Sequence, residues 1–381
     1  MTEVIYLDYA ASTPVDPRVV EAMTPFHGSA NPASAHVAGR DAAEAVEAAR
    51  RDVARLIGGS AGEIVFTSGA TEADNLALGG AVRAAEFGHI VTTAAEHKAV
   101  LETAKEWCPE TTVVPVESTG AVDPARIEAA LRSDTLIVSV MVANNEVGTL
   151  SAIDEIGSLC RQRGVLFHTD AAQAGGKLAI DINVTQIDLM SLSAHKMYGP
   201  KGVGALWVRR DIRPRIKPLI FGGGHERGLR SGTTNVAGCV GFGEAARLAL
   251  GELDADDHRC RTLRRRLLDQ AESLLVAAKL NGHPEECLPG IVSLRLPGVD
   301  AESLLMATPL VAASTGSACT SSVPAPSHVL RAMGLSHDTA TEAIRLSFGR
   351  FTSQDEIDSA IEALAASVET IRDVTVEVSA C

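Results

Sequence analysis

Short apolar runs alternate with segments of helical spacing through the first two hundred residues. The apolar runs predict strands at 63–68, 89–94, 111–116, 136–143, 165–173, 189–196 and 204–210. The run at 136–143 is continuously apolar, as expected of a strand covered on both faces. Apolar residues at helical spacing predict helices at 41–57 and 153–163. Strands that alternate with helices predict an α/β fold with a mostly parallel sheet.

The pattern changes near residue 250. A long helical stretch covers 244–280, a short strand follows at 291–298, and a closing helix is predicted at 353–373. Ser353 and Glu356 form a capping box at its start. With 381 residues the chain exceeds the usual size of one core. We therefore expect a large domain at 16–255 and a smaller α+β domain formed by 1–15 and 256–381.

Composition narrows the classes of function. Aromatic residues make up only 3% of the chain, so aliphatic side chains must build the core, and the net charge is −14. An acidic chain repels phosphate backbones, which disfavours direct nucleic-acid binding. No apolar run is long enough to span a membrane, and the N-terminus lacks a signal-peptide pattern. We expect a cytoplasmic protein that binds neither a membrane nor nucleic acid directly.

Cysteine usage singles out one residue. The chain has seven cysteines, an odd number, and none forms a CxxC pair. This predicts neither a disulfide framework nor a metal site, and most of the cysteines are expected to be buried small apolar residues. Cys319 differs because small and polar residues surround it at 313–322. Such a segment predicts an accessible loop, and an accessible thiol can react where its thiolate is stabilised.

Lys196, within 193–202, follows a predicted strand in a setting of small residues. A lysine in a loop is usually a solvated charge, but this one could form a Schiff base with pyridoxal phosphate. That cofactor also needs a carboxylate for its ring nitrogen and a cradle for its phosphate. Asp170 lies at the end of a predicted strand, where ligands bind in open parallel sheets. Strand-end aspartates otherwise cap helices or form turns.

The segment 67–75 has the character of a phosphate cradle. Small residues lead to Thr71 and an acidic helical turn, and the N–H groups at a helix N-terminus bind phosphate. The segment lacks the ending of a nucleotide-binding P-loop, and alone it is equally an ordinary capped helix start. His97 lies in 95–100, and two adjacent amides lie in 143–148. These amides could bind a ring hydroxyl or a substrate carboxylate, or could merely close a turn.

Together these motifs resemble one family over nearly the whole chain. They are 5–19, 31–36, 63–77, 96–100, 144–148, 168–173, 193–202, 222–233, 314–321 and 344–352. In this order they are similar to the cysteine desulfurases of the NifS/IscS type, which are pyridoxal-phosphate enzymes of fold type I. The resemblance implies a large domain with a mostly parallel seven-stranded sheet and a smaller α+β domain.

The resemblance also implies roles for residues around the cofactor ring. Lys196 would hold pyridoxal 5'-phosphate covalently and Asp170 would pair with the ring nitrogen. His97 would stack on the ring and could move a proton at the substrate thiol. Gln173 and Asn145 would contact the side of the ring that carries the hydroxyl, with Asn145 also near the substrate carboxylate.

Further implied roles concern the phosphate and the substrate. The implied phosphate ligands are Ala70, Thr71, Ser193 and His195. Thr233 would reach the phosphate of a neighbouring subunit, which implies a homodimer. Arg345 would clamp the carboxylate of L-cysteine with two N–H groups, which suits a guanidinium. Cys319 would take the sulfur as a persulfide and pass it to an acceptor protein.

The sequence departs from the family in two places. Ala194 stands where many members carry glycine, and the chain stops soon after its last predicted helix, where iron–sulfur housekeeping members extend further. This puts scaffold docking in doubt and leaves iron–sulfur assembly, tRNA thiolation and DNA phosphorothioation open as pathways. Two other classes also stay open. Another enzyme of fold type I, such as a selenocysteine lyase, an aminotransferase or a β-lyase, would not need Cys319, and a non-catalytic docking protein would not bind the cofactor.

Overall fold

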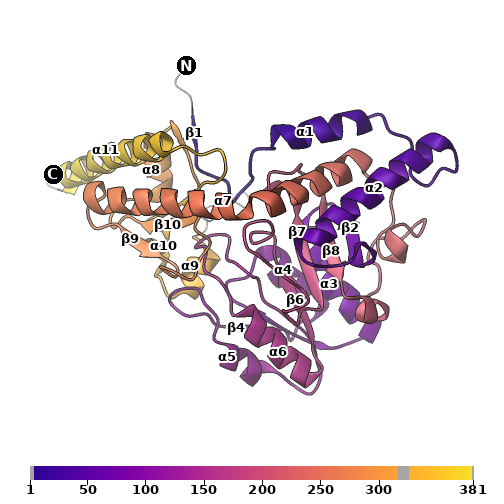
Figure 1. Ribbon diagram of the computed structural model, residues 1–381. Coiled ribbons are helices and arrows are strands. Elements are labelled where there is room, and N and C mark those ends of the chain that lie inside the picture. The colour runs from indigo at the N-terminus through magenta and orange to yellow at the C-terminus, as the bar shows by residue number, and fades with distance from the viewer. Residues whose placement is uncertain (1–3, 316–325, 380–381) are drawn as a thin grey trace.

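The computed structural model describes residues 4–315 and 326–379, which form two parts joined by one long helix (Figure 1). The larger part contains a seven-stranded sheet in the order β2-β8-β7-β6-β5-β3-β4. Its strands are β2 Ile64–Thr67, β3 His89–Thr93, β4 Thr112–Val114, β5 Thr135–Ser139, β6 Leu166–Asp170, β7 Leu189–Ser193 and β8 Gly204–Val208. Only β8 runs antiparallel to its neighbours. The prediction of a mostly parallel α/β sheet is confirmed.

The apolar run at 136–143 is longer than the strand it forms. β5 ends at Ser139, but the chain continues beside β6. The N–H groups of Val140 and Val142 donate to the carbonyls of His168 and Asp170. The segment is apolar beyond the strand because it stays buried up to the edge of the sheet.

Helices cover both faces of this sheet. They include α1 Pro17–Met23, α2 Val37–Leu56, α3 Ala70–Ala85, α4 Lys98–Trp107, α5 Pro124–Ala130 and α6 Ile153–Arg163. Short 3-10 helices are η1 Thr24–Phe26, η2 Ala61–Glu63, η3 Ala194–Lys196, η4 Arg210–Arg215 and η5 Glu226–Gly228. The predicted helix at 41–57 begins earlier, at Val37, because the ring of His36 accepts the N–H of Gly39 and caps it.

Two apolar clusters form the core of the larger part because neighbouring residues of a strand face opposite ways. In β5, Ile137 belongs to the cluster that α3 and α4 cover, and Val138 belongs to the cluster that α2 and α7 cover. Aliphatic side chains dominate both clusters, as the composition predicts. Trp207 and Phe167 are the largest side chains buried there completely.

The long helix α7, Val236–Leu274, runs through both parts of the molecule (Figure 1). Phe242 near its beginning packs into the core of the larger part, while Leu263 and Leu267 pack into a separate core in the smaller part. The helix starts earlier than the predicted 244–280. It also ends earlier, because β9 takes up the end of that stretch. No described helix, the 39-residue α7 included, has the length and apolar character of a membrane span.

The smaller part combines an antiparallel sheet, in the order β12-β10-β9, with the ends of the chain. Its elements are β9 Lys279–Asn281, β10 Ile291–Arg295, α8 Ala301–Ala307, β11 Val311–Ala312, α9 His328–Ala332, α10 His337–Thr341, β12 Ala343–Ser347 and α11 Gln354–Ser379. The N-terminal strand β1, Ile5–Tyr6, pairs with β11. The capping box of α11 is confirmed, because Glu356 Oε2 accepts the N–H of Ser353 at 2.7 Å.

The described cysteines behave mostly as the composition predicts. Cys108, Cys160, Cys239 and Cys287 are buried, Cys260 is partly buried, and none of these five is in a disulfide. Cys319 and Cys381 lie outside the described residues. The structure therefore accounts for the apolar cysteines but does not test the predicted nucleophile.

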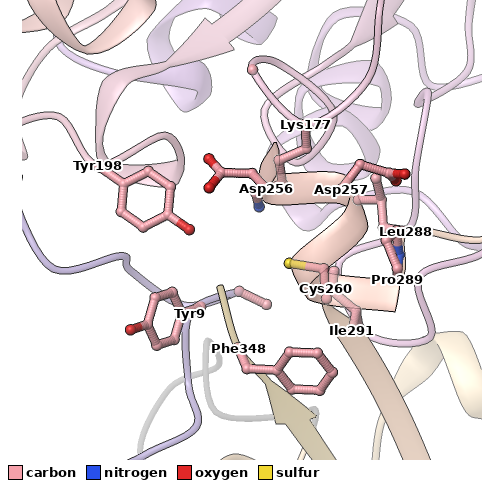
Figure 2. Close-up of a pocket in the computed structure, with 13 residues that line it drawn as sticks. Tyr9, Lys177, Tyr198, Asp256, Asp257, Cys260, Leu288, Pro289, Ile291 and Phe348 are labelled. Carbon is pink, nitrogen blue, oxygen red and sulfur yellow. The ribbon is translucent and has the colours of Figure 1, made fainter. Parts of the chain in front are cut away.

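A small cavity of about 30 Å³ lies where the two parts meet (Figure 2). Tyr198 lines it from the larger part, Tyr9 lines it from the N-terminal segment, Cys260 lines it from α7, and Phe348 lines it just after β12. Lys177 also contributes to its wall. The cavity is large enough for about one water molecule, so the join between the two parts is well packed.

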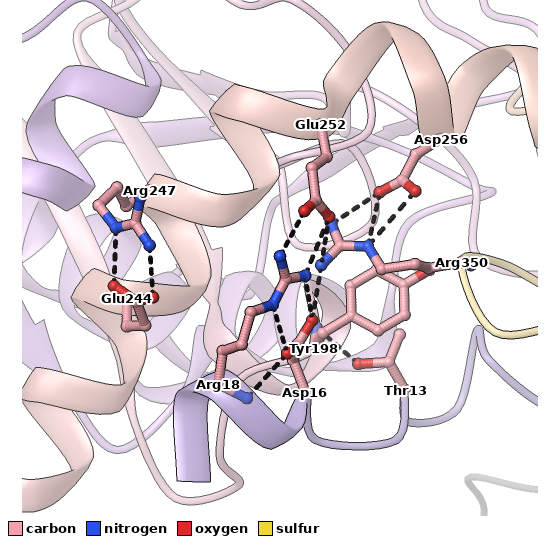
Figure 3. Close-up of polar contacts among 9 residues, drawn as sticks. All are labelled: Thr13, Asp16, Arg18, Tyr198, Glu244, Arg247, Glu252, Asp256 and Arg350. Atoms are coloured by element: carbon pink, nitrogen blue, oxygen red, sulfur yellow. Dashed lines mark hydrogen bonds and ion pairs between the residues drawn. The ribbon is translucent and has the colours of Figure 1, made fainter. Parts of the chain in front are cut away.

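A cluster of ion pairs beside this cavity fastens the two parts together (Figure 3). Arg350, from the connection between β12 and α11, pairs with Asp256 of α7 at 2.7 Å and with Asp16 at 2.9 Å. Asp16 is the N-cap of α1 and also pairs with Arg18, which reaches Glu252 of α7. Arg18 holds the pKa of Asp16 down, at about 2. One arginine of the smaller part thus ties two helices together.

Candidate active site

A cavity of about 500 Å³ lies at the carboxyl ends of the parallel strands. Asp170 is the last residue of β6, Ser193 is the last residue of β7, and Lys196 ends the turn that follows β7. Ligands bind at this edge in open α/β sheets. The cavity is therefore placed where the topology of the sheet predicts a site.

The structure brings most of the predicted residues to this one cavity. Those lining it are Ala70, Thr71, His97, Asn145, Asp170, Gln173, Ser193, His195, Lys196 and Arg345. Thr233 is not part of its lining, and Cys319 lies outside the described residues. Sequence reasoning missed Ala10, Ala11, Asp74, Met141 and Lys201, which also line the cavity.

Lys196 is held by the N-terminal segment. Its Nζ donates hydrogen bonds to the carbonyl oxygens of Ala10 and Ala11, the latter at 2.8 Å. This segment is itself bound to the turn after β7, because the hydroxyl of Thr13 donates to the carbonyl of His195 at 3.0 Å. The amino group is thus aimed by a part of the chain that lies far from it in sequence.

Asp170 is buried, with 6% of its surface exposed. Burial raises the pKa of its carboxyl group, while the N–H of Ala172, 2.8 Å from Oδ1, and the nearby His97 and Lys196 favour the charged form. The carboxylate thus gains from any cation placed beside it. The protonated ring nitrogen of pyridoxal phosphate is such a cation.

His97 caps helix α4. Its Nδ1 accepts the N–H of Ala99 at 3.1 Å, so the hydrogen of the neutral ring lies on Nε2. Burial lowers the pKa of His97, and Asp170 acts in the opposite direction. Burial therefore favours the neutral form of the ring, and His97 lines the cavity.

The two amides predicted at 143–148 have different tasks. Asn144 closes the turn, because its Oδ1 accepts the N–H groups of Glu146 and Val147 and its Nδ2 donates to the carbonyl of Ala95. Asn145 lines the cavity instead. The turn-closing interpretation thus holds for Asn144, while the position of Asn145 leaves it available to a ligand in the cavity.

The start of α3 has the features of an anion site. Its N-cap, Gly69, supplies no side chain to the first N–H groups, and an added Cβ there would meet nothing within 4 Å. The hydroxyl of Ser193 is buried and has no hydrogen-bond partner within the described part of the chain. Gly204 of β8 allows close packing, because an added Cβ would lie 2.7 Å from Gly69. These groups fit a phosphate.

Arg345 of β12 reaches the cavity from the smaller part. Its Nη2 pairs with Asp8 at 2.7 Å and its Nη1 donates to the carbonyl of Asn145 at 2.8 Å. Only 3% of the arginine is exposed. The guanidinium is thereby fixed at the edge of the cavity, with Asp8 as its one charged partner among the ion pairs of the described residues.

Two buried acids lie near enough to Asp170 to feel its charge, and the sequence does not predict their burial. Asp74 of α3 and Glu96 are both fully buried, and burial raises the pKa of each well above its usual range, with the charge of Asp170 adding to the effect. Glu96 accepts the N–H of Met141 at 2.6 Å, whereas neither carboxyl oxygen of Asp74 has a hydrogen-bond partner in the described structure. Burial thus favours the protonated form of both acids, whereas His97, Lys196 and the N–H of Ala172 favour the charged form of Asp170.

Comparison with known proteins agrees with this architecture. The family model for class-V aminotransferases matches residues 5–359, and the chain therefore belongs to the class-V aminotransferase family. Within it, the chain is 51% identical over 380 residues to cysteine desulfurase IscS of Anaeromyxobacter dehalogenans, covering 97% of this chain and 94% of that protein. Its identity to cysteine desulfurase IscS of Pectobacterium carotovorum is 49%, with the same coverage.

The solved structure of a NifS-like protein has the same fold, with a TM-score of 0.90 and 36% identity. The alignment covers 96% of this chain and all of that one. The predicted fold class and the predicted family are thus both confirmed. Members of this family use pyridoxal phosphate.

Proposed function

We propose that this chain is a cysteine desulfurase, which converts L-cysteine to L-alanine and takes the sulfur as a persulfide on Cys319. One observation carries the proposal. Asp170 at the end of β6, Lys196 in the turn after β7 and Arg345 of β12 come from both parts of the molecule and line one cavity at the carboxyl edge of the sheet. The similarity to proteins named cysteine desulfurase supports the same reaction here.

Pyridoxal 5'-phosphate, bound in this cavity, would supply an electron sink for breaking bonds at the substrate carbon atoms. Asp170 would hold the proton on the ring nitrogen, since a buried carboxylate gains most from an adjacent cation. Gln173 and His195 would face the ring oxygen and the phosphate. The phosphate fits the start of α3, where Ala70, Thr71 and the unpartnered hydroxyl of Ser193 can donate to it.

Lys196 and His97 would move the protons. Lys196 Nζ would take the proton from the α-carbon of the substrate, and the carbonyls of Ala10 and Ala11 would keep the amino group in place. His97 can take the proton of the substrate thiol, because Asp170 favours its charged form. The neutral ring carries its lone pair on Nδ1. Uptake of the thiol proton there would therefore displace the hydrogen bond that Nδ1 accepts from the N–H of Ala99.

Arg345 would bind the substrate carboxylate. A two-pronged contact needs two N–H groups along one edge of the guanidinium. Asp8 occupies one edge and is 21% exposed, so it is the contact that a carboxylate would displace. Asn145 lies beside this position, because its backbone carbonyl accepts a hydrogen bond from Arg345.

The thiolate of Cys319 would then attack the sulfur of the substrate. A sulfur–sulfur bond forms, the carbon–sulfur bond breaks, and its electron pair goes to the carbon, which takes up a proton to give alanine. The persulfide would be passed to an acceptor protein, which suits a nucleophile in a segment rich in small polar residues.

We also propose a homodimer in which Thr233 reaches the phosphate of the partner subunit. A second cavity of about 350 Å³ beside α3 supports this arrangement, because Thr71 lines both cavities. Ile220, which lines it, and the neighbouring Phe221 are 42% and 68% exposed. The two domains would be 16–255 and 1–15 with 256–381, which places their boundary in the middle of α7.

The test measures alanine released from L-cysteine by the purified protein with added pyridoxal phosphate and a thiol reductant. We expect alanine from the native chain, none above background from Cys319→Ala, and native rates from Cys108→Ala, which removes a buried thiol away from the cavity. Alanine from Cys319→Ala at the native rate would favour a lyase that needs no thiol. A native chain that binds no pyridoxal phosphate would refute the proposal altogether.

A further inference from the structure

Lys177 bonds directly to a residue of the candidate active site. Its Nζ donates a hydrogen bond to Oε1 of Gln173 at 3.2 Å. Gln173 lines the large cavity, whereas Lys177 lines the small cavity between the two parts (Figure 2). The hydrogen bond therefore joins the wall of one cavity to the wall of the other.

The side-chain amide of Gln173 is held at both of its ends. Its Nε2 donates to the carbonyl oxygen of Ala10 at 2.8 Å, and that oxygen can only accept. Lys177 supplies a donor at the other end. An amide with an acceptor beside its nitrogen and a donor beside its oxygen has one satisfactory orientation. This leaves the second N–H of Nε2 as the group that Gln173 can offer to a ligand in the large cavity.

No ion pair joins Lys177 to a carboxylate within residues 4–315 and 326–379. Asp256, the acid of α7 in the same cavity wall, is paired with Arg350. The ionisable groups of that wall are Tyr9, Tyr198, Asp256, Asp257 and Cys260. Burial, together with the charges of Lys196 and Arg345, lowers the pKa of Lys177 to about 7, and Cys260 acts in the opposite direction. A buried amine with no bound carboxylate is costly. In the described part of the chain, the hydrogen bond to Gln173 is the polar contact that this amine makes.

We propose that Lys177 is a positioning residue, which fixes the amide of Gln173 so that an N–H, and not the carbonyl oxygen, faces the ring oxygen of bound pyridoxal phosphate. The inference rests on the cofactor function proposed above. A donor beside the ring oxygen favours the form of the bound cofactor that has lost a proton, whereas a carbonyl oxygen there disfavours it. Lys177 therefore sets the pH at which the cofactor changes colour.

The test is a pH titration of the visible absorption band of the protein loaded with pyridoxal phosphate. Lys177→Met removes the amine and keeps the length of the side chain, so we expect the midpoint to rise by about half a pH unit or more. Lys105→Met alters an exposed lysine of α4 and should leave the midpoint unchanged. A Lys177→Met protein that titrates like the native one would overturn the inference. Lys177→Leu serves the same purpose where Lys177→Met does not fold.

A double-mutant cycle separates positioning from a simple effect of charge. If Lys177 acts through the amide, Lys177→Met should no longer shift the midpoint in a Gln173→Ala protein. A shift that persists in full there means that the amine acts through space, which contradicts a positioning role.

The outcomes also separate this inference from the proposed function. A native chain that binds no pyridoxal phosphate overturns both. A native chain that binds it and releases alanine, with equal midpoints for native and Lys177→Met proteins, overturns the role of Lys177 alone.

Discussion

Replacing Arg350 by methionine tests how strongly the ion-pair cluster fastens the two parts. Only 9% of the arginine side chain is exposed, and its partner Asp16 is 2% exposed. Removing one partner of a buried pair costs about 3–5 kcal/mol, because the remaining charge is left buried. Asp16 keeps Arg18, and Asp256 is 16% exposed, so we expect the lower end, about 3 kcal/mol.

The matched control is Arg247→Met, and Figure 3 also shows the native Arg247. Arg247 pairs with Glu244 one turn away on the same α7, but 54% of its side chain is exposed. An exposed pair of this kind contributes about 0.5 kcal/mol or less. Urea unfolding followed by the fluorescence of the buried Trp207 measures both variants. Equal midpoints for Arg350→Met and Arg247→Met would refute the reasoning that burial makes the cluster strong.

Three further predictions concern the site and the pH dependence. Gly204→Ala should lower the affinity for pyridoxal phosphate at least about tenfold in a fluorescence titration, because its Cβ would lie 2.7 Å from Gly69. The control is Gly251→Ala, which has open space around it and should bind the cofactor normally. Its free energy of unfolding in urea should rise by about 0.5–1 kcal/mol. Asp170→Asn should still bind the cofactor but lose at least about a hundredfold in alanine release, and a native rate would contradict its pairing with the ring nitrogen. The folded pKa of Asp16 is depressed to about 2, so its contribution to stability is present above its unfolded pKa and is lost as pH falls towards 2; an Asp16→Asn protein should lack that part of the loss in acid unfolding curves.

The sequence predicts elements and motifs that are local. Strand and helix signals depend on residues a few positions apart, so the seven strands of the large sheet were predictable. Asp170 and Lys196, which were singled out from local motifs, line one cavity in the structure. The start of α2 was missed because His36, an unusual N-cap, extends that helix.

Contacts between distant segments could not be predicted. Ala10 and Ala11 bind Lys196 through backbone carbonyls, which carry no sequence signal. Asp74 stands one helical turn into α3, where an acid reads as a solvated first-turn residue, yet the fold buries it completely. In the sequence, Lys177 has the character of a surface charge. In the structure, it lines a cavity together with residues of α7.

The N-terminal strand β1 has a consequence for synthesis on the ribosome. Its partner β11 begins at Val311, and the ion-pair partner of Asp8 is Arg345. Residues 5–8 can therefore form these contacts only after some three hundred more residues have been synthesised. At about 5–20 residues per second this delay is on the order of 15–60 s. During that time Lys196 lacks the carbonyls of Ala10 and Ala11 in their final position. The nascent chain therefore acquires a complete cofactor pocket only after Arg345 has been added.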